Sequence, residues 1–380
     1  MAVLSDAQRE AGWTIVKLGD IATVVTGQTP SKKFPEHWGE KGEIPFLTPK
    51  DQAIGIRSVD TERYISREYS DIYEKRIVPE GAVALTCIGS LGKISVVQTA
   101  TLTNQQINSI IPDGSKANNL YIYYYLMSSY DSLESLAGGT VMPIVNKTSL
   151  EGMEIPLPPL DEQERIAGIL GSLDDKIEAN TRLIQTLDSL GEAVVRKYLR
   201  SVQKTKKLID IAHIVMGQSP KGETLNTEGS GVLFFQGKKD FGFRYPTPRT
   251  YTTAATRMAE PLDILFSVRA PIGALNRSVE SCCVGRGLAA IRSSCGQENT
   301  LFYTLKTNPN LWEKFEGEGT IFSAINKKGL SELDIPFSET AISNGVEDFL
   351  TSVEQEIFSL EQENLQLAAT RDALIKRLIG

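Results

Sequence analysis

The stretch that decides the fold is 161-DEQERIAGILGSLDDKIEANTRLIQTLDSLGEAVVRKYL-199. One set of positions in it recurs at alternating intervals of three and four residues and is mostly apolar, whereas charged side chains gather at the other positions. This seam consists of Ile166, Leu170, Leu173, Ile177, Asn180, Ile184, Leu187, Gly191, Val194 and Tyr198. A heptad pattern of this length is typical of a coiled-coil helix, and a helix packed on a single globular core rarely needs it.

A second seam with the same phase lies near the end of the chain. It consists of Val346, Leu350, Val353, Ile357, Leu360, Asn364, Leu367, Arg371, Leu374 and Leu378. Two matched seams in one chain predict that the two helices pack on each other as an intramolecular coiled coil. The alternative is two unrelated helices, each lying on its own domain.

The direction of this pairing follows from the chain between the helices. Residues 200–339 have the size of one compact domain, and the termini of a domain are usually close together. The second helix should therefore begin near the end of the first, and the pair should be antiparallel. Centring the seams pairs positions whose numbers sum to 544, so that Asn180 faces Asn364. One polar layer in an apolar seam costs stability and fixes the register of the helices.

Length and composition indicate a globular protein with more than one domain. The chain has 380 residues, of which 41% are hydrophobic. No window approaches the eighteen apolar residues of a membrane span, and the N-terminal sequence lacks the core of a signal peptide. There are four cysteines without a Cys-x-x-Cys spacing and two histidines, so we expect neither disulfides nor a metal site. These features predict a reduced, cytoplasmic protein without a membrane partner.

The charge is distributed unevenly along the chain. The net charge of −7 divides into −2 for residues 1–150, −4 for 151–200, +4 for 201–337 and −5 for 338–380. The acidity therefore lies mostly on the two helices, and the second globular part is basic. The overall charge argues neither for nor against a nucleic-acid partner, because local patches decide that question.

The globular part before each helix is an internal repeat. KLGDIATVVTGQTPSKK at 17–33 matches KLIDIAHIVMGQSPKGE at 207–223, and residues 139–156 match residues 319–336. Between them, Phe46, Lys50 and Asp51 match Phe235, Lys239 and Asp240, and the turn around Gly92 matches the turn around Gly273. The remaining middle segments barely match. A shared scaffold with divergent middles suggests one task performed twice on different targets.

The repeat predicts four parts, namely a domain at 1–158, a long helix at 159–200, a second domain at 201–338 and a second long helix at 339–380. Within the first domain, we expect a short helix at Leu18–Ala22, strands within 43–51 and 103–112, a hairpin at 81–97, and a helix at 118–137 with buried tyrosines. Asp161 should be the N-cap of the first long helix. The fold class is therefore α+β, with two similar mixed α/β domains joined by a pair of long antiparallel coiled-coil helices, related by a pseudo-twofold internal repeat.

Sequence patterns for catalysis are missing from the chain. There is no Gly-x-x-x-x-Gly-Lys-Ser/Thr phosphate loop, no complete dinucleotide fingerprint, no Asn-Pro-Pro-aromatic run and no His-Glu-x-x-His. We therefore predict no catalytic residue. The alternative is a nuclease with a diffuse active site.

Polar side chains suited to DNA cluster in the expected loops instead. Gln and Arg bind base edges, and Lys, Arg and Ser hold phosphates. The predicted DNA-binding residues are Gln28, Ser31, Lys32, Lys50, Lys93, Gln105, Gln218, Lys221, Lys238, Lys239, Arg244, Arg269 and Arg286. For each of them, an ordinary surface residue is the alternative. The pairs Asn146-Lys147 and Asn326-Lys327 recur in both copies, so they either bind DNA or form a shared structural turn.

Several of these segments resemble landmarks of a known family. Leu-Gly-Asp-Ile-Ala at 18–22, Gly-Gln-Thr-Pro at 27–30, and Pro-Leu-Pro-Pro-Leu-Asp-Glu-Gln-Glu-Arg-Ile-Ala at 156–167 are similar to those of the specificity subunit of a type I restriction-modification system. The resemblance covers residues 13–380. The second copy departs from the pattern, with Leu-Ile-Asp-Ile-Ala at 208–212 and Pro-Phe-Ser-Glu-Thr-Ala-Ile at 336–342.

The resemblance implies that each globular domain is a target-recognition domain for one half of a bipartite site in double-stranded DNA. It also implies that the helices are a spacer on which two methyltransferase (modification) subunits dock, and that restriction (motor-nuclease) subunits join them. S-adenosylmethionine, ATP and magnesium would belong to those partners, and this chain would hold no cofactor and be no enzyme. The alternatives are a free-standing sequence-specific DNA-binding regulator and a coiled-coil spacer that carries two protein-binding modules.

Overall fold

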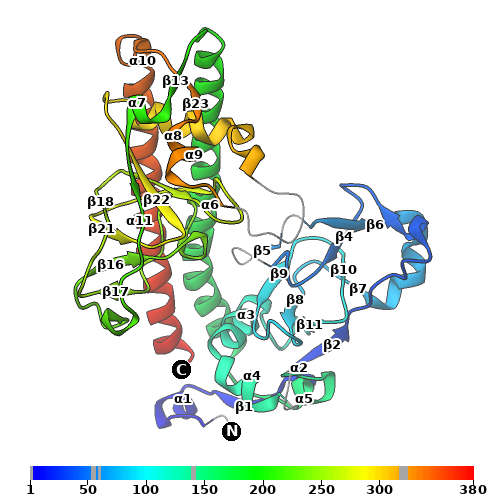
Figure 1. Ribbon diagram of the computed structural model, residues 1–380. Coiled ribbons are helices and arrows are strands. Elements are labelled where there is room, and N and C mark those ends of the chain that lie inside the picture. Colours follow the sequence, from blue (N-terminus) through cyan, green and yellow to red (C-terminus); the bar gives the residue numbers. More distant parts are fainter. Residues whose placement is uncertain (1–2, 53–56, 59–60, 138–142, 316–323) are drawn as a thin grey trace. The chain divides into compact units, whose positions relative to one another are not determined.

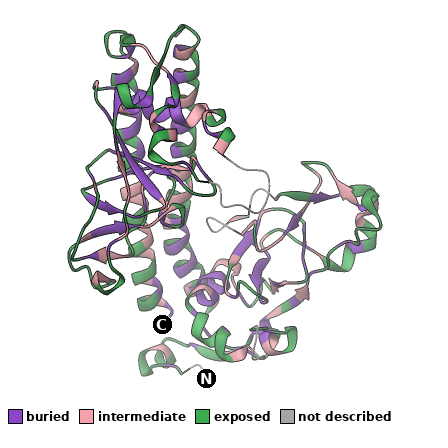
Figure 2. Ribbon diagram, in the orientation of Figure 1, coloured by how far each residue is buried: buried purple, intermediate pink, exposed green. Residues whose placement is uncertain are grey.

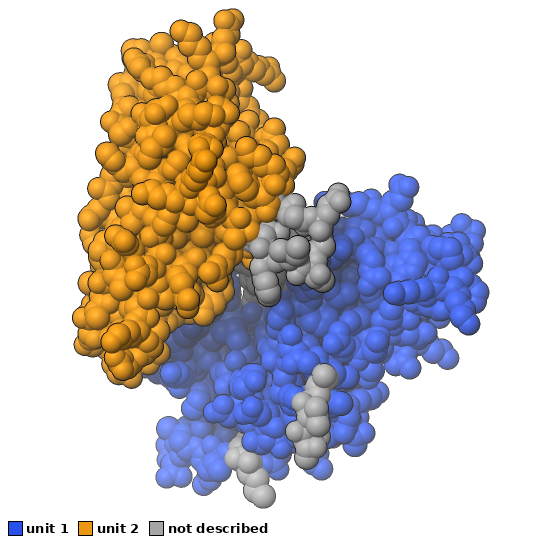
Figure 3. Space-filling model, viewed as in Figure 1, with its two compact units in different colours: residues 1–180, 363–380 blue, residues 181–362 orange. Residues whose placement is uncertain are grey.

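The computed structural model describes residues 3–52, 57–58, 61–137, 143–315 and 324–380. The chain divides into two compact units (Figure 3). Unit 1 contains residues 1–180 and 363–380, and unit 2 contains residues 181–362. The division crosses both long helices, α6 (Leu160–Leu199) and α11 (Val346–Leu378), so each unit consists of one sheet-rich domain and half of each helix.

In unit 1 the two helix halves run antiparallel. Asn180 is hydrogen-bonded to Asn364, and Asp174 is paired with Arg371. A lower residue number in α6 thus pairs with a higher residue number in α11, which is the antiparallel arrangement. Further along, Ile166 and Leu170 lie in the same buried cluster as Ile375 and Ile379.

In unit 2 the other halves of α6 and α11 lie side by side (Figure 1) and share a buried apolar cluster. It is made by Ile184 together with Val353, Ile357 and Leu360, with Leu187 packed against it. All of these residues belong to the two predicted seams. The fold class predicted from the sequence is therefore confirmed.

The beginnings of the two helices differ from the prediction. Helix α6 begins at Leu160, directly after Pro158 and Pro159, so Asp161 lies in its first turn and is not its N-cap. The side chain that joins this end to the domain is Gln163, whose Nε2 donates to the carbonyl of Pro158 at 2.9 Å. The segment 339–380 is not one helix. It begins with a short helix α10 (Thr340–Ser343) and turns at Gly345, which has a φ of +76°.

Among its described residues, unit 1 contains two five-stranded sheets, in the orders β2-β11-β8-β9-β5 and β3-β6-β4-β10-β7, and a two-stranded pair of β1 with β12. The strands are β1 (Thr14–Lys17), β2 (Ala22–Thr26), β3 (Trp38–Gly39), β4 (Ile44–Leu47), β5 (Arg57–Ser58), β6 (Arg63–Ile65), β7 (Ile77–Val78), β8 (Val83–Thr86), β9 (Ile94–Val97), β10 (Thr101–Thr103), β11 (Ile107–Pro112) and β12 (Glu154–Leu157). The α-helices before α6 are α1 (Asp6–Glu10), α2 (Leu18–Ile21), α3 (Asn119–Ser128), α4 (Tyr130–Leu136) and α5 (Lys147–Glu151), and two 3-10 helices lie at Pro35–His37 and Arg67–Arg76.

Unit 2 has the corresponding sheets β14-β22-β19-β20 and β15-β17-β16-β21-β18, and the pair of β13 with β23. Its strands are β13 (Thr205–Lys207), β14 (Ala212–Met216), β15 (Leu225–Asn226), β16 (Val232–Phe235), β17 (Tyr251–Thr252), β18 (Met258–Ala259), β19 (Ile264–Ser267), β20 (Leu275–Arg277), β21 (Cys282–Val284), β22 (Leu288–Ser293) and β23 (Asp334–Pro336). Besides α10 and its parts of α6 and α11, its α-helices among the described residues are α7 (Leu208–Ile211), α8 (Glu298–Thr307) and α9 (Lys327–Ser331).

The order of these elements confirms the internal repeat. The first residues of the repeated segments 139–156 and 319–336 lie outside the described residues.

One predicted match within the repeat shifts by a position. The backbone N–H of Gln28 donates to Thr103, and that of Gln218 donates to Val284, so Thr103 and Val284 are equivalent. In the parallel pairs, the residue before Thr103 lies opposite Phe46, and the residue before Val284 lies opposite Phe234. Phe46 therefore corresponds to Phe234 and not to the residue after it. The loop after β16 is thus one residue longer than the loop after β4.

Helix α3 is buried on its aromatic side, as predicted (Figure 2). Tyr121, Tyr123, Tyr124 and Tyr125 are all buried. The hydroxyl of Tyr124 donates to Asp174 of α6 at 2.6 Å. The predicted helix over 118–137 is interrupted at Ser129, where α3 ends and α4 follows. The tyrosines therefore join the sheet of unit 1 to α6.

The recurring asparagine-lysine pairs form a structural turn. The Oδ1 of Asn146 accepts from the backbone N–H of Ser149, and the Oδ1 of Asn326 accepts from the N–H of Gly329, both at 2.8 Å. Each asparagine is thus the N-cap of a short helix, α5 or α9. Of the two interpretations of these pairs, the structural turn is the one that the contacts support.

Within the described part of the chain, no helix combines the length and the apolar composition that crossing a membrane requires.

Candidate nucleic-acid interface

In unit 1, four strand ends carry the predicted DNA-binding residues, and backbone contacts hold these ends together. The N–H of Gln28, after β2, donates to the carbonyl of Thr103 at 2.8 Å, and the N–H of Asn104 donates to Leu47 at 3.0 Å. The Nζ of Lys93, in the hairpin between β8 and β9, donates to the carbonyl of Pro49 at 2.7 Å. We call the loops 27–33, 48–52, 87–93 and 104–106 loop cluster 1.

Unit 2 repeats this arrangement at equivalent positions. The N–H of Gln218 donates to the carbonyl of Val284 at 2.9 Å, and the N–H of Gly285 donates to Phe235 at 2.8 Å. The N–H of Val268 donates to Gly287 at 3.0 Å, which repeats the contact between Cys87 and Gln106 in unit 1. We call the loops 217–221, 236–240, 268–274 and 285–287 loop cluster 2. The same backbone contacts therefore build both clusters.

The glycine of each Gly-Gln-Thr/Ser-Pro turn is required by close packing. A Cβ atom at Gly27 would lie 2.2 Å from the carbonyl oxygen of Asn104, and one at Gly217 would lie 2.1 Å from that of Gly285. Real Cβ contacts are never this short, so only glycine allows the strand end to approach the neighbouring loop. These two glycines bring Gln28 and Gln218 into their clusters.

Most predicted DNA-binding residues are exposed within the two clusters. In cluster 1 they are Gln28, Ser31, Lys32, Lys50, Lys93 and Gln105; in cluster 2 they are Gln218, Lys221, Lys238, Lys239, Arg269 and Arg286. Some have protein partners. The Nζ of Lys50 lies 2.6 Å from Glu62, and the Oε1 of Gln105 accepts from Thr29. The structure therefore brings these residues together, and their contact with DNA stays a prediction.

Arg244 is the exception, and the prediction for this residue is wrong. It is 1% exposed, and its guanidinium is paired with Asp188 of α6 and with Glu354 of α11, the latter at 3.3 Å. It also lies over the ring of Phe302, 4.4 Å from the ring centre. A guanidinium enclosed in this way cannot reach a phosphate or a base.

Arg63 of β6 was not among the predicted DNA-binding residues, yet it is exposed beside loop cluster 1. Its guanidinium stacks over Trp38 at 4.3 Å and over Phe46 at 5.0 Å, and it lines a hollow of about 450 Å³ with Lys50 and Glu62. Strand pairing brings Arg63 opposite Phe46, and no sequence pattern marks this long-range contact. A stacked arginine in such a position suits the binding of a base or a phosphate.

The acid that follows each cluster lysine has a structural role. The Oδ2 of Asp51 accepts from the N–H of Thr48 at 2.8 Å, and the Oδ2 of Asp240 accepts from the N–H of Gln236 at 2.7 Å. Each aspartate closes the turn after its strand and so fixes the loop that carries Lys50 or Lys239. The sequence repeat identified these Lys-Asp pairs but not this function.

The thiols and acids of the described residues form no metal site. No group of three or more His, Cys, Asp or Glu side chains within this part of the chain could hold an ion. Burial raises the pKa of the Cys87 thiol to about 11 and that of Cys282 to about 12. Both cysteines therefore stay protonated at neutral pH and serve as apolar side chains.

The predicted register residues meet within unit 1. The Nδ2 of Asn180 donates to the Oδ1 of Asn364 at 3.0 Å and to Glu363 at 2.7 Å. Further along the pair, Arg371 donates to Asp174 at 2.7 Å, and Asp174 accepts from Tyr124. Two polar layers thus interrupt the apolar seam of this unit.

We expect the double substitution Asn180→Leu with Asn364→Leu to raise the free energy of unfolding by roughly 1–2 kcal/mol, because a buried polar layer is replaced by apolar contact. Each single variant should be less stable than the double variant, since it leaves one asparagine facing a leucine. The register should also loosen. Urea titration measures the stability, and cysteine cross-linking between neighbouring seam positions measures the register. A double variant less stable than both single variants would contradict the expectation.

Glu361 of α11 gives unit 2 a pH dependence. Burial raises the pKa of its carboxyl to about 7. Arg244 opposes this shift, because its backbone N–H donates to Oε1 at 3.3 Å and its positive charge lies nearby. The charge of Glu354 raises the pKa further. Because the folded pKa lies above the ordinary value of 4.5, the folded state binds this proton more tightly. The contribution of this bound proton to the free energy of unfolding is therefore complete below about pH 4.5 and is lost as the pH rises towards 7.

Glu361→Gln should therefore stabilise the protein at pH 8 more than at pH 5, by on the order of 1–2 kcal/mol after allowance for solvent screening. Glutamine keeps the acceptor for the N–H of Arg244 and removes the titration. Denaturant unfolding of both proteins at the two pH values checks this. Glu356→Gln, at an exposed position on the same helix, is the control and should not show the difference.

Comparison with known proteins gives the following matches. Residues 10–189 match the family described as type I restriction modification DNA specificity domain. A protein of Methanocaldococcus jannaschii is provisionally described as the MjaX specificity subunit of a type I restriction enzyme. It is 27% identical to this chain over an alignment of 402 residues, gaps included, and the alignment covers 97% of this chain and 92% of that protein. The MjaIX specificity subunit of the same organism is 34% identical over 47% of this chain and 41% of its own length.

Among solved structures, a type I restriction-modification S subunit from M. genitalium has a similar fold. The TM-score is 0.62 at 17% sequence identity, and the match covers 97% of this chain and 96% of that one.

Proposed function

We propose that the chain is a specificity subunit of a type I restriction-modification system, because residues 10–189 match the specificity-domain family and a specificity subunit of Methanocaldococcus jannaschii matches along 97% of the chain. In this role it recognises a bipartite site in double-stranded DNA, one half-site with each loop cluster. The observation that carries this proposal is the repetition of the clusters. The same backbone hydrogen bonds assemble both clusters, yet the exposed side chains on them differ. Two equal scaffolds with different side chains suit two different short sequences.

We further propose that two copies of a methyltransferase subunit dock on the helices, and that restriction subunits join this complex. Two features support two copies of one partner. Ile169 and Phe349 stand at equivalent heptad positions of α6 and α11, and are 37% and 39% exposed. The segments that contain the helices carry −4 and −5, so a basic partner surface would complement each of them.

The chain itself is proposed to be non-catalytic, with S-adenosylmethionine, ATP and magnesium bound by its partners. Its expected place is the cytoplasm, where the DNA and these subunits are.

Reconstitution tests the function. The purified chain alone should neither methylate nor cleave DNA in the presence of S-adenosylmethionine, ATP and magnesium. Addition of the methyltransferase subunit from the same host should give methylation at a site of two fixed half-sites separated by a spacer of fixed length. Turnover by the chain alone would exclude the non-catalytic role, and methylation at a continuous site would exclude bipartite recognition. A DNA-binding regulator without partners would bind its site but never support methylation.

A further inference from the structure

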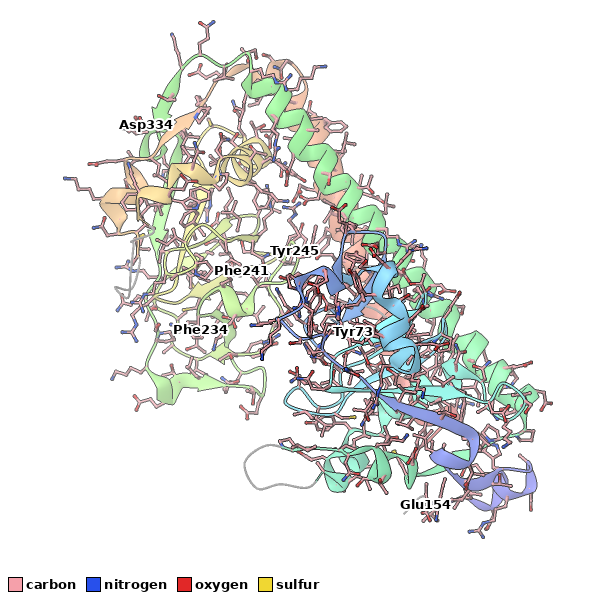
Figure 4. All side chains as sticks on the ribbon, turned by 90° about the vertical axis from the view of Figure 1, so that its right-hand side faces the viewer. Tyr73, Glu154, Phe234, Phe241, Tyr245 and Asp334 are labelled. Carbon is pink, nitrogen blue, oxygen red and sulfur yellow. The ribbon has the colours of Figure 1, made fainter. Side chains whose placement is uncertain are left out.

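Arg244 lies on the same short loop as Lys238 and Lys239 of loop cluster 2. These residues are close in the sequence, but the lysines are exposed and the arginine is buried among the helices of unit 2. Figure 4 labels Phe241 and Tyr245, the aromatic residues that flank this turn. The loop therefore joins the proposed DNA surface directly to the coiled coil.

At its inner end the loop is attached to both helices. The guanidinium of Arg244 is paired with Asp188 of α6 and with Glu354 of α11. Its backbone N–H donates to Glu361, and the ring of Tyr245 packs edge-on against Phe358 at 5.3 Å, both on α11. These contacts fix the inner end of the loop to α6 and α11 at once.

The rest of the loop transmits this position to the lysines. Asp240 accepts from the N–H groups of Gln236 and Gly237, and its own carbonyl accepts from the N–H of Thr247 at 2.8 Å. Phe241 and Pro246 form a β-bridge between these points. Because these hydrogen bonds and the β-bridge join the two sides of the loop, the contacts of Arg244 with the helices also determine the position of Lys238 and Lys239.

Stability alone does not account for this arginine. Among the described residues, the Nε of Arg244 is buried without a hydrogen-bond partner, and the Nε of Arg277 and the Oε2 of Glu354 lie 3.3 Å apart as an ion pair but make no hydrogen bond. A buried ionic group that is incompletely satisfied is often no more stable than apolar side chains of the same size. What such a group can supply is a defined geometry.

In unit 1 the equivalent buried acid is paired with a cation from a different element. There, Asp174 takes the place of Glu354, and its arginine is Arg371, which comes from the helix itself. The position of unit 2 equivalent to Arg371 is Gly191, where a Cβ would lie 2.5 Å from the ring of Tyr303. The ring of Tyr303 therefore occupies the space that a side chain at 191 would need, and the sheet-rich domain of unit 2 provides Arg244 instead.

We propose that Arg244 is a positioning residue that sets the place of loop cluster 2 on the helix pair and thereby makes the complex strict about spacer length. It acts through Lys238 and Lys239 and touches no DNA. This inference rests on the proposed bipartite recognition.

The test measures methylation by the reconstituted complex on DNA series in which the spacer is one base pair shorter, correct, or one base pair longer. Arg244→Met should reduce the preference for the correct spacer by about tenfold, because the loop is no longer held at one place. Discrimination against base changes in the half-site recognised by unit 1 should stay within about twofold of the wild type. Folding should persist, since Asp188 keeps Lys306 and Glu354 keeps Arg277.

Two matched variants separate positioning from stability and from DNA contact. Tyr303→Phe removes hydrogen bonds from the same buried network but leaves the loop attached, so spacer preference should not change. Lys239→Gln should weaken binding at every spacer length alike. If Arg244→Met does not fold, Arg244→Lys takes its place, because a lysine keeps the charge but cannot bridge both acids.

Hydrogen exchange gives a readout that is independent of DNA. The backbone amides of residues 238–245 and 247 should exchange about tenfold faster in the Arg244 variant than in the wild type, whereas in Tyr303→Phe their exchange should not change. Unchanged spacer preference in a folded Arg244 variant overturns the positioning role. If the wild-type complex itself shows no preferred spacer, it is the proposed function that fails.

Discussion

Replacing residues 13–157 with the equivalent segment of a relative that recognises another site is expected to change one half of the recognised sequence and to leave the other half unchanged. The physical reason is that loop cluster 1 is assembled from contacts within this segment. Gln28, Lys50, Lys93 and Gln105 are all held by residues between 27 and 106.

The ends of the exchanged segment are also neighbours in the fold. Strand β1 pairs antiparallel with β12, so that Thr14 lies opposite Leu157 and Lys17 opposite Glu154. A cut on each side of this pair removes a closed unit. The donor should keep a tyrosine at the position of Tyr124 and an arginine at that of Arg57, because these side chains bind acids of α6.

Each mismatched base pair costs about 1–3 kcal/mol, so methylation of the parental site should fall by about 100-fold or more. Methylome sequencing of the chimera detects the new half-site directly. A chimera that exchanges residues 13–157 for those of a relative with the same first half-site is the control and should keep the parental site. If both half-sites changed in the first chimera, independent recognition by the two clusters would be wrong.

A second large effect is expected from lengthening the helices. One heptad inserted into α6 after Asn180 and another into α11 after Gln362 keep the seams in phase and add about 10 Å of helix. The attached domain turns by only about 20°. At about 3.4 Å per base pair, 10 Å corresponds to roughly three base pairs, but the duplex also rotates over that distance.

We therefore expect the preferred spacer to lengthen by roughly one to three base pairs, with weaker binding from residual twist and with both half-site sequences unchanged. Methylome sequencing of the double-insertion variant measures the spacer. An insertion in one helix alone is the control, because it places the seams out of register and should abolish methylation. An unchanged spacer with full activity would show that the helices do not set the distance.

The features that the sequence predicted well are those that repeat with a fixed period. The seams of α6 and α11, and the facing of Asn180 with Asn364, follow from heptad spacing alone, because a helix turns regularly. The strands β4, β8, β9 and β11 and the buried tyrosines of α3 followed from local patterns of the same kind.

The features that the sequence did not predict depend on tertiary contact. The start of α11 at Val346 is set by the turn at Gly345, and the start of α6 by prolines and by Gln163, which binds back to the domain. The correspondence of Phe46 with Phe234 became visible only from strand register. No pattern within one repeat could have revealed these contacts.

Arg244 shows why candidate site residues are harder to predict than elements. In the sequence it is one of four cations between positions 238 and 249, and nothing local separates it from Lys238 or Lys239. Its burial depends on Asp188 and Glu354, which lie far from it in the sequence, one before it and one after it. A charged residue that faces two acids across the fold is, in sequence terms, indistinguishable from one that faces solvent.

The glycine at 191 and the arginine at 371 have a consequence for pieces of the chain. They stand at equivalent positions of α6 and α11, so the two halves of the chain repeat the same order of elements but differ in charge at this position. A pair of first halves would bury Asp174 twice without an arginine. A pair of second halves would place Arg371 beside Arg244 and Arg277 at each Glu354. If the protein were cut after Arg200 and the fragments were mixed, each half would therefore select the other over a copy of itself.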